Sequence, residues 1–240
     1  MSAAILIATT FSLGFFIESI IGFGGGLIAY SILGFFMDLK EMIIAGLYIG
    51  TCSSAYIAYS DFKSFDKKIF KSLIPICLIG TIIGVIIFSK FSGQNLAIFF
   101  GILLILLAIK TMFFEHKILP KKFKEILLFF GGISQGAFGI GGPFFVNALK
   151  NDFKNKSQLR TTMAIIFVFF NLIRLIQLFL LKQIKVDFFG NIWWTIIFIF
   201  LAIKLGHLVH LKISEEVFKK GIALMTIFAG IKFLTKALFV

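Results

Sequence analysis

The chain has 240 residues, of which 59% are hydrophobic and only 15% are charged. A soluble domain of this length needs far more polar surface, so these proportions exclude an ordinary soluble fold and indicate surface that faces lipid. The net charge of +13 does not indicate nucleic-acid binding. The lysines lie in short segments between apolar runs, where basic residues mark the side of the membrane on which a loop lies.

Eight apolar units follow one another along the chain. The first four cover residues 2–37, 42–60, 69–89 and 95–114, and the other four cover 123–150, 159–181, 187–208 and 215–240. A helix needs about 20 apolar residues to cross the hydrocarbon layer of a membrane. The first unit has no basic leading segment and no small-residue cleavage site, so we expect it to be retained as a span. The pattern predicts an all-α integral membrane protein.

The last four units repeat the first four at an offset of 117 residues. The counterparts include Gly22-Phe23-Gly24-Gly25-Gly26 with Gly139-Ile140-Gly141-Gly142-Pro143, Glu18 with Gln135, and Ser54 with Asn171. One such match is weak, but here the register is shared along the whole chain. We therefore expect two membrane repeats, residues 1–117 and 118–240, each of four units with the first unit broken by a glycine cluster.

The first unit of each repeat either crosses the membrane once or returns to the side from which it came. If it returns, the loops on one side carry 17 lysines and arginines and those on the other side carry six. A single crossing would scatter these residues over both sides. Because basic residues concentrate on the cytoplasmic side, we expect the returning form, with both termini outside and the two repeats inverted relative to each other.

The glycine clusters indicate broken helices. A break leaves free N–H groups and the positive end of a helix dipole at membrane depth, which is tolerated only inside protein or beside a cavity. Two helix starts that point inward would form an anion site. The candidate substrate-binding glycines are Gly22, Gly24, Gly25, Gly26, Gly139, Gly141 and Gly142. The alternative role is close helix packing, which we favour for the separate GxxxG pair Gly80 and Gly84.

Arg174 lies near the centre of the unit 159–181, with Asn171 one helical turn earlier on the same face. An arginine at this depth costs at least about 2.5–3.5 kcal/mol, so it should face a cavity, a partner or a substrate. Its planar fork suits oxyanions, which makes Arg174 and Asn171 further substrate-binding candidates. The alternative is an ion pair with Glu18. Glu18 is equally a candidate for binding a coupling proton or cation, whereas its counterpart Gln135 cannot titrate.

These features resemble the TauE/SafE sulfite exporter family. The resemblance rests on two apolar halves that each open with a GxGGG-like break, Gly22–Gly26 and Gly139–Pro143, and it covers essentially the whole chain. Pro143 stands where the family pattern usually has glycine. The resemblance implies a transporter in the inner or plasma membrane for small anions such as sulfite, sulfoacetate and other organosulfur compounds. It also implies that the glycines of both clusters belong to the site.

We therefore predict a secondary transporter that moves a small oxyanion, of sulfite or sulfonate type, across the cell membrane by alternating access. No ATPase motif is present, and no nucleophile and base lie at one depth, so we expect neither an enzyme nor a cofactor or metal site. The expected partners are the substrate anion and the lipid bilayer. The alternatives are a cation- or proton-coupled transporter of another small solute, with Glu18 as its main ligand, and a membrane assembly protein that transports nothing.

Overall fold

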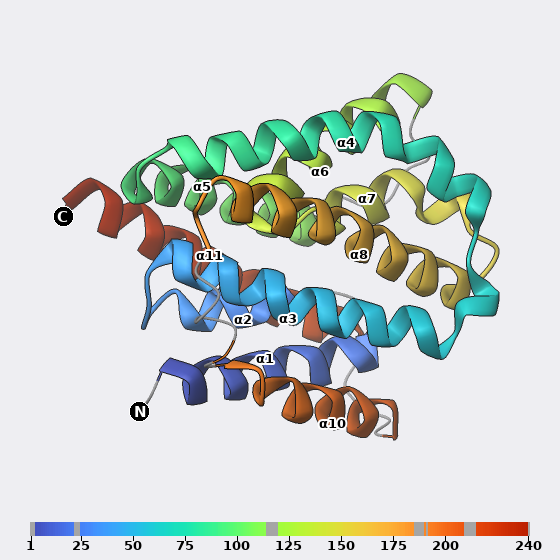
Figure 1. Cartoon of the computed structure of the whole chain (residues 1–240), viewed down its shortest axis with the longest axis horizontal. Coiled ribbons are helices and arrows are strands. Elements are labelled where there is room, and N and C mark those ends of the chain that lie inside the picture. Colours follow the sequence, from blue (N-terminus) through green and yellow to red (C-terminus); the bar gives the residue numbers. More distant parts are fainter. Residues whose placement is uncertain are drawn as a thin grey trace. The chain divides into compact units, whose positions relative to one another are not determined.

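The computed structural model describes residues 3–21, 25–113, 120–184, 190, 192–208 and 215–239. Within these residues every regular element is a helix, as the sequence predicts (Figure 1). The elements in chain order are α1 (Ala3–Ile21), α2 (Gly25–Leu33), α3 (Leu39–Ser60), η1 (Phe62–Ser64), α4 (Lys67–Lys90), α5 (Gly93–Phe113), α6 (Lys121–Phe138), α7 (Gly142–Leu149), η2 (Lys150–Asp152), α8 (Lys156–Leu180), α10 (Thr195–Leu208) and α11 (Glu215–Phe239).

Four of the described helices, α3, α4, α5 and α8, are long and apolar enough to cross a membrane. The apolar parts of α1 and α10 are shorter, at Ala3–Ser19 and Thr195–Gly206. Large apolar side chains are exposed on several of these helices, among them Leu13, Phe99, Ile176 and Leu201. Lipid solvates such side chains, whereas water does not, so this surface fits the membrane location that the composition predicts.

The chain forms two compact units, and each is assembled from separate stretches of sequence. Unit 1 consists of Met1–Gly46, Phe91–Glu115 and Phe189–Val240, and unit 2 consists of Leu47–Lys90 and His116–Phe188. Unit 1 therefore holds α1, α2, α5, α10, α11 and the first turns of α3, while unit 2 holds the rest of α3 with α4, α6, α7 and α8. Each unit contains helices from both halves of the sequence. The two compact units therefore do not coincide with residues 1–117 and 118–240, whose relationship as repeats stays a prediction.

In unit 1, α1 packs against α10, α2 folds back along α1, and α11 packs against α5 and α2 (Figure 1). Glycines allow the closest approach between α5 and α11. A β-carbon at Gly101 would lie 2.7 Å from the carbonyl oxygen of Gly230, and one at Gly230 would lie 2.8 Å from that of Gly101. The ring of Tyr30 on α2 packs edge-on against Phe11 and Phe100, with centroids 6.0 and 6.1 Å apart. These contacts tie α1, α2 and α5 together.

In unit 2, α4 lies along α6 with the two backbones in direct contact. A β-carbon at Gly80 or Gly84 of α4 would lie 2.4 or 2.2 Å from a carbonyl oxygen of α6. A β-carbon at Gly132 or Gly136 of α6 would lie 2.5 or 2.2 Å from a carbonyl oxygen of α4. Four glycines thus form one seam between the helices, which is the close packing that the sequence predicts for Gly80 and Gly84.

Two aspartates in the loop between α3 and α4 hold the first turns of α8. The carboxylate of Asp61 accepts hydrogen bonds from the hydroxyls of Ser157 and Ser64. These hydrogen bonds hold the pKa of Asp61 below its usual value. Asp66 Oδ2 accepts a hydrogen bond of 2.9 Å from Gln158 Nε2. The start of α8 is therefore fixed to this loop by hydrogen bonds with both aspartates.

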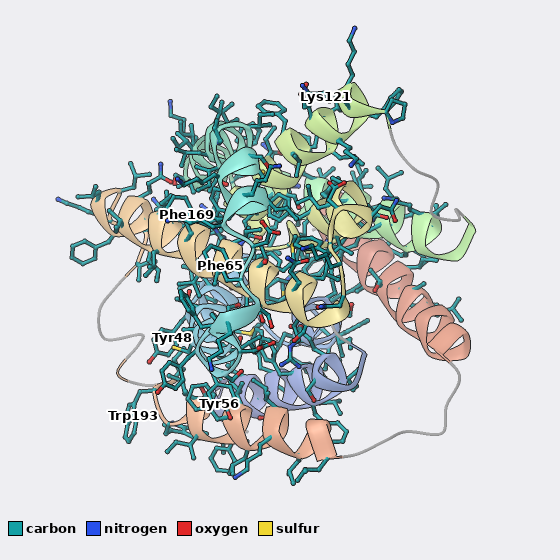
Figure 2. The ribbon with its side chains drawn as sticks, turned by 90° about the vertical axis from the view of Figure 1, so that its right-hand side faces the viewer. Tyr48, Tyr56, Phe65, Lys121, Phe169 and Trp193 are labelled. Carbon is teal, nitrogen blue, oxygen red and sulfur yellow. The ribbon has the colours of Figure 1, made fainter. Side chains whose placement is uncertain are left out.

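Aromatic rings extend this attachment along α8. Phe65 in the loop packs edge-on against Phe70 of α4, and Phe70 packs edge-on against Phe169 of α8, with centroids 5.5 and 5.6 Å apart. Figure 2 labels Phe65 and Phe169 on their elements. Edge-to-face pairs of this kind stabilise a packing beyond the apolar area they bury. They position α8, which carries the candidate site residues, against α4.

Candidate functional site

The first glycine cluster lies between α1, which ends at Ile21, and α2, which begins at Gly25. Glu18 Oε2 accepts a hydrogen bond of 2.7 Å from the backbone N–H of Gly25. A β-carbon at Gly25 would lie 2.7 Å from the carbonyl oxygen of Gly14, whereas one at Gly26 would meet nothing within 4 Å. Gly25 is therefore enclosed and Gly26 borders open space. Of the other predicted site residues, Gly22 and Gly24 lie outside the described residues.

The second cluster lies between α6, which ends at Phe138, and α7, which begins at Gly142. Gly139 adopts the left-handed conformation, with φ of 77°, which glycine reaches without steric cost. Gln135 Oε1 accepts a hydrogen bond of 2.9 Å from the backbone N–H of Gly141. A β-carbon at Gly141 would lie 2.8 Å from the carbonyl oxygen of Gly131. The chain thus reverses at Gly139, and α7 folds back along α6.

Two side chains of α8 attach to the end of α6 beside this second break. Gln135 Nε2 donates a hydrogen bond of 2.8 Å to Asn171 Oδ1, and Arg174 Nε donates one of 2.9 Å to the carbonyl oxygen of Gly136. Asn171 and Gln135 are buried, and Arg174 is 0% exposed. The sequence predicts that Arg174 faces a cavity, a partner or a substrate, and the structure assigns it a backbone partner.

The structure therefore joins three predicted site residues of unit 2, Gln135, Gly141 and Asn171, into one buried, hydrogen-bonded cluster. The fourth, Arg174, is hydrogen-bonded to Gly136, the residue next to Gln135. Gly139 and Gly142 flank this cluster along the chain. In unit 1, Glu18 is hydrogen-bonded to Gly25, and Gly26 follows in the chain. Because Glu18 and Arg174 belong to different units, the ion pair between them stays a prediction.

Sequence reasoning missed Gly131, Gly132 and Gly136. Gly136 has two roles, because it lies in the seam with α4 and its carbonyl oxygen accepts the hydrogen bond from Arg174. The GxxxG spacing of Gly132 and Gly136 was the signal that would have found the seam. No sequence pattern predicts which backbone carbonyl accepts this hydrogen bond, since every residue has a carbonyl group. Among the residues that the structure describes, no group of three or more histidines, cysteines, aspartates or glutamates is placed to hold a metal ion.

The apolar helices of the described chain are those of a multi-pass membrane protein. The chain belongs to the sulfite exporter TauE/SafE family, whose family model matches residues 6–233. This match confirms the predicted family, which is a family of transporters, and it implies a small anionic substrate and contact with membrane lipid. No curated protein and no solved structure matched the chain.

Proposed function

We propose that this protein moves a small oxyanion, of sulfite or sulfonate type, across the cell membrane by alternating access. The observation that carries the proposal is the fully buried Arg174, which donates to the Gly136 carbonyl immediately before a helix break. Burying a guanidinium at membrane depth costs free energy, so the presence of Arg174 there favours a functional role. Its planar fork binds two oxygens of one anion at once, which suits sulfite and sulfonate groups.

The proposed binding residues surround the second helix break. Arg174 supplies the positive charge, and Asn171, one turn earlier on α8, supplies a polar side chain that Gln135 holds in place. The start of α7, after Gly139, Gly141 and Gly142, adds the positive end of a helix dipole. In unit 1, Gly25 and Gly26 form the corresponding start of α2, and a β-carbon at Gly26 would meet nothing within 4 Å.

Alternating access in this proposal uses two inverted repeats, residues 1–117 and 118–240. The first unit of each repeat folds as two helices that pack together, α1 with α2 and α6 with α7. Each of these pairs also packs against a helix from the third apolar segment of the other repeat, since α1 contacts α10 and α6 contacts α4. This exchange of partners supports a pseudo-symmetric arrangement, and in this proposal both termini lie outside.

A cysteine that replaces the exposed Ser92 tests this topology. We expect an impermeant maleimide to label Ser92→Cys in intact cells, because residues 90–93 are proposed to lie outside. The matched control is Lys122→Cys, at an exposed position in the first turn of α6, in a basic segment that is proposed to lie inside. Both variants are made after Cys52 and Cys77 are replaced by alanine. Labelling of Lys122→Cys, but not of Ser92→Cys, in intact cells contradicts the inverted topology.

Flux into proteoliposomes tests the function itself. We expect saturable uptake of one oxyanion from a panel of sulfite, sulfate, sulfoacetate and chloride, and we expect the same anion to raise the thermal unfolding midpoint of the purified protein. Transport of a cation without any anion would favour the alternative centred on Glu18. A protein that neither transports nor is stabilised by any small solute would instead be an assembly protein.

A further inference from the structure

Glu18 and Gln135 hold the two helix breaks in the same way. Glu18 lies three positions before Ile21, where α1 ends, and Gln135 lies three positions before Phe138, where α6 ends. Each uses one side-chain oxygen to accept a hydrogen bond from a backbone N–H across the break. The distances are 2.7 Å from Gly25 N to Glu18 Oε2 and 2.9 Å from Gly141 N to Gln135 Oε1.

The glycines that donate these hydrogen bonds are enclosed by equivalent groups. A β-carbon at Gly25 would lie 2.7 Å from the carbonyl oxygen of Gly14, and one at Gly141 would lie 2.8 Å from that of Gly131. Gly14 and Gly131 are separated by the same 117 positions as Glu18 and Gln135. The donor glycines are offset by one position from this register, because Gly25 lies seven residues after Glu18 and Gly141 lies six residues after Gln135. An acceptor side chain, a donor glycine and an enclosing glycine nevertheless form the same kind of device once in each repeat.

The two devices differ in whether the acceptor side chain can ionise. Gln135 is a neutral amide, and its Nε2 donates to Asn171, so it links the break to α8 beside Arg174. Glu18 is a carboxylic acid in the same place relative to its break. An ionised carboxylate at a helix N-terminus neutralises the positive end of the helix dipole and repels a second anion. A neutral amide satisfies the N–H group without adding that repulsion.

We infer that Glu18 and Gln135 are matched positioning residues that act through their acceptor oxygens, and that the oxyanion binds at the second break because the side chain there is neutral. The part of this inference that concerns the oxyanion rests on the proposed function. It differs from the coupling role that the sequence leaves open for Glu18. A coupling group must change its protonation state, whereas an acceptor of this kind needs only an oxygen, which glutamine also has.

Three variants test the inference, measured by flux of the transported oxyanion between pH 5.5 and 8 and by thermal unfolding. Glu18→Gln keeps the acceptor oxygen, so we expect a maximal rate within about twofold of wild type and an unchanged pH profile. Glu18→Ala removes the acceptor from the helix start, so we expect the rate to fall about fivefold or more and the unfolding midpoint to drop. Rescue by glutamine, but not by alanine, identifies the oxygen as the essential group.

Gln135→Glu places the charge at the second break. Its carboxylate still accepts from Gly141, and its second oxygen can accept from the Asn171 amide N–H₂ once that amide rotates, so we expect the protein to fold. Repulsion of the substrate should raise KM about tenfold with a smaller change in maximal rate. Glu18→Gln should leave KM unchanged. The contrast between these two charge changes locates the oxyanion at the second break.

Several results would overturn the inference. Loss of flux in Glu18→Gln, or a flattened pH profile, would show that the carboxyl proton is needed. Wild-type flux and stability in Glu18→Ala would show that the acceptor oxygen at the start of α2 is not needed. An unchanged KM in Gln135→Glu would show that the oxyanion does not bind at the second break. If Glu18→Ala does not fold, the KM values and pH profiles of Glu18→Gln and Gln135→Glu still test the inference. If wild type moves no oxyanion, the proposed function fails, and the unfolding midpoints of Glu18→Gln and Glu18→Ala still test whether the hydrogen bond from Gly25 to residue 18 stabilises the break.

Discussion

Replacing Arg174 by alanine is expected to abolish saturable oxyanion flux. The change removes the fully buried guanidinium and its hydrogen bond of 2.9 Å to the Gly136 carbonyl oxygen. Charge-assisted hydrogen bonds are worth about 1.5–3 kcal/mol each, so loss of a two-point contact with an anion should weaken binding by roughly 100-fold or more. Initial rates over a range of substrate concentrations in proteoliposomes give KM and the maximal rate.

Two further variants make this result specific. Arg174→Lys keeps a positive charge but loses the planar fork and the Nε donor. We therefore expect its oxyanion flux to lie between those of Arg174→Ala and wild type, with KM raised about tenfold. Lys71→Ala removes one positive charge from an exposed position of the same unit and should leave flux unchanged. Saturable flux in Arg174→Ala at wild-type KM would exclude Arg174 from the binding site.

Replacing Gly136 by alanine is expected to lower the stability of unit 2 strongly. The new β-carbon would lie 2.2 Å from the backbone carbonyl oxygen of Thr81, and no side-chain rotation relieves a contact with backbone. The helices α4 and α6 must therefore move apart along the glycine seam. Overpacking of this kind costs about 1–3 kcal/mol and occasionally more. The displaced Gly136 carbonyl should also weaken the Arg174 hydrogen bond, so we expect flux to fall as well.

Gly50→Ala is the matched control, because the same methyl group is added to a helix of the same unit. The nearest atom to its β-carbon would be Asn171 Nδ2 at 3.7 Å, an ordinary contact distance. Alanine is favoured over glycine in a helix by about 1 kcal/mol, so this variant should be as stable as wild type or slightly more stable. Thermal unfolding in detergent compares the two variants. Equal midpoints for Gly136→Ala and Gly50→Ala would mean that the seam is not tightly packed.

The positions of most helices could be predicted because membrane chemistry acts locally. A backbone in lipid must satisfy its own hydrogen bonds, so a long apolar run becomes a helix. The predicted units 42–60, 69–89 and 95–114 correspond to α3 (Leu39–Ser60), α4 (Lys67–Lys90) and α5 (Gly93–Phe113). Arg174 could be singled out for the same reason, since the cost of a buried charge depends on its depth in an apolar run. The roles of the glycines were harder to predict, because close packing and helix breaking use the same residue.

The sequence by itself determined the membrane class, the helical architecture and the family, since these follow from apolar run length, the spacing of short motifs and the match over residues 6–233. Only the tertiary structure decided which groups meet at the site. Gln135 reaches Asn171 across 36 positions, and Arg174 reaches the Gly136 carbonyl across 38 positions. Such contacts depend on how α6 and α8 pack, and that packing depends in turn on the glycine seam between α6 and α4. Periodicity describes one helix at a time, whereas a hydrogen bond between helices requires their relative position.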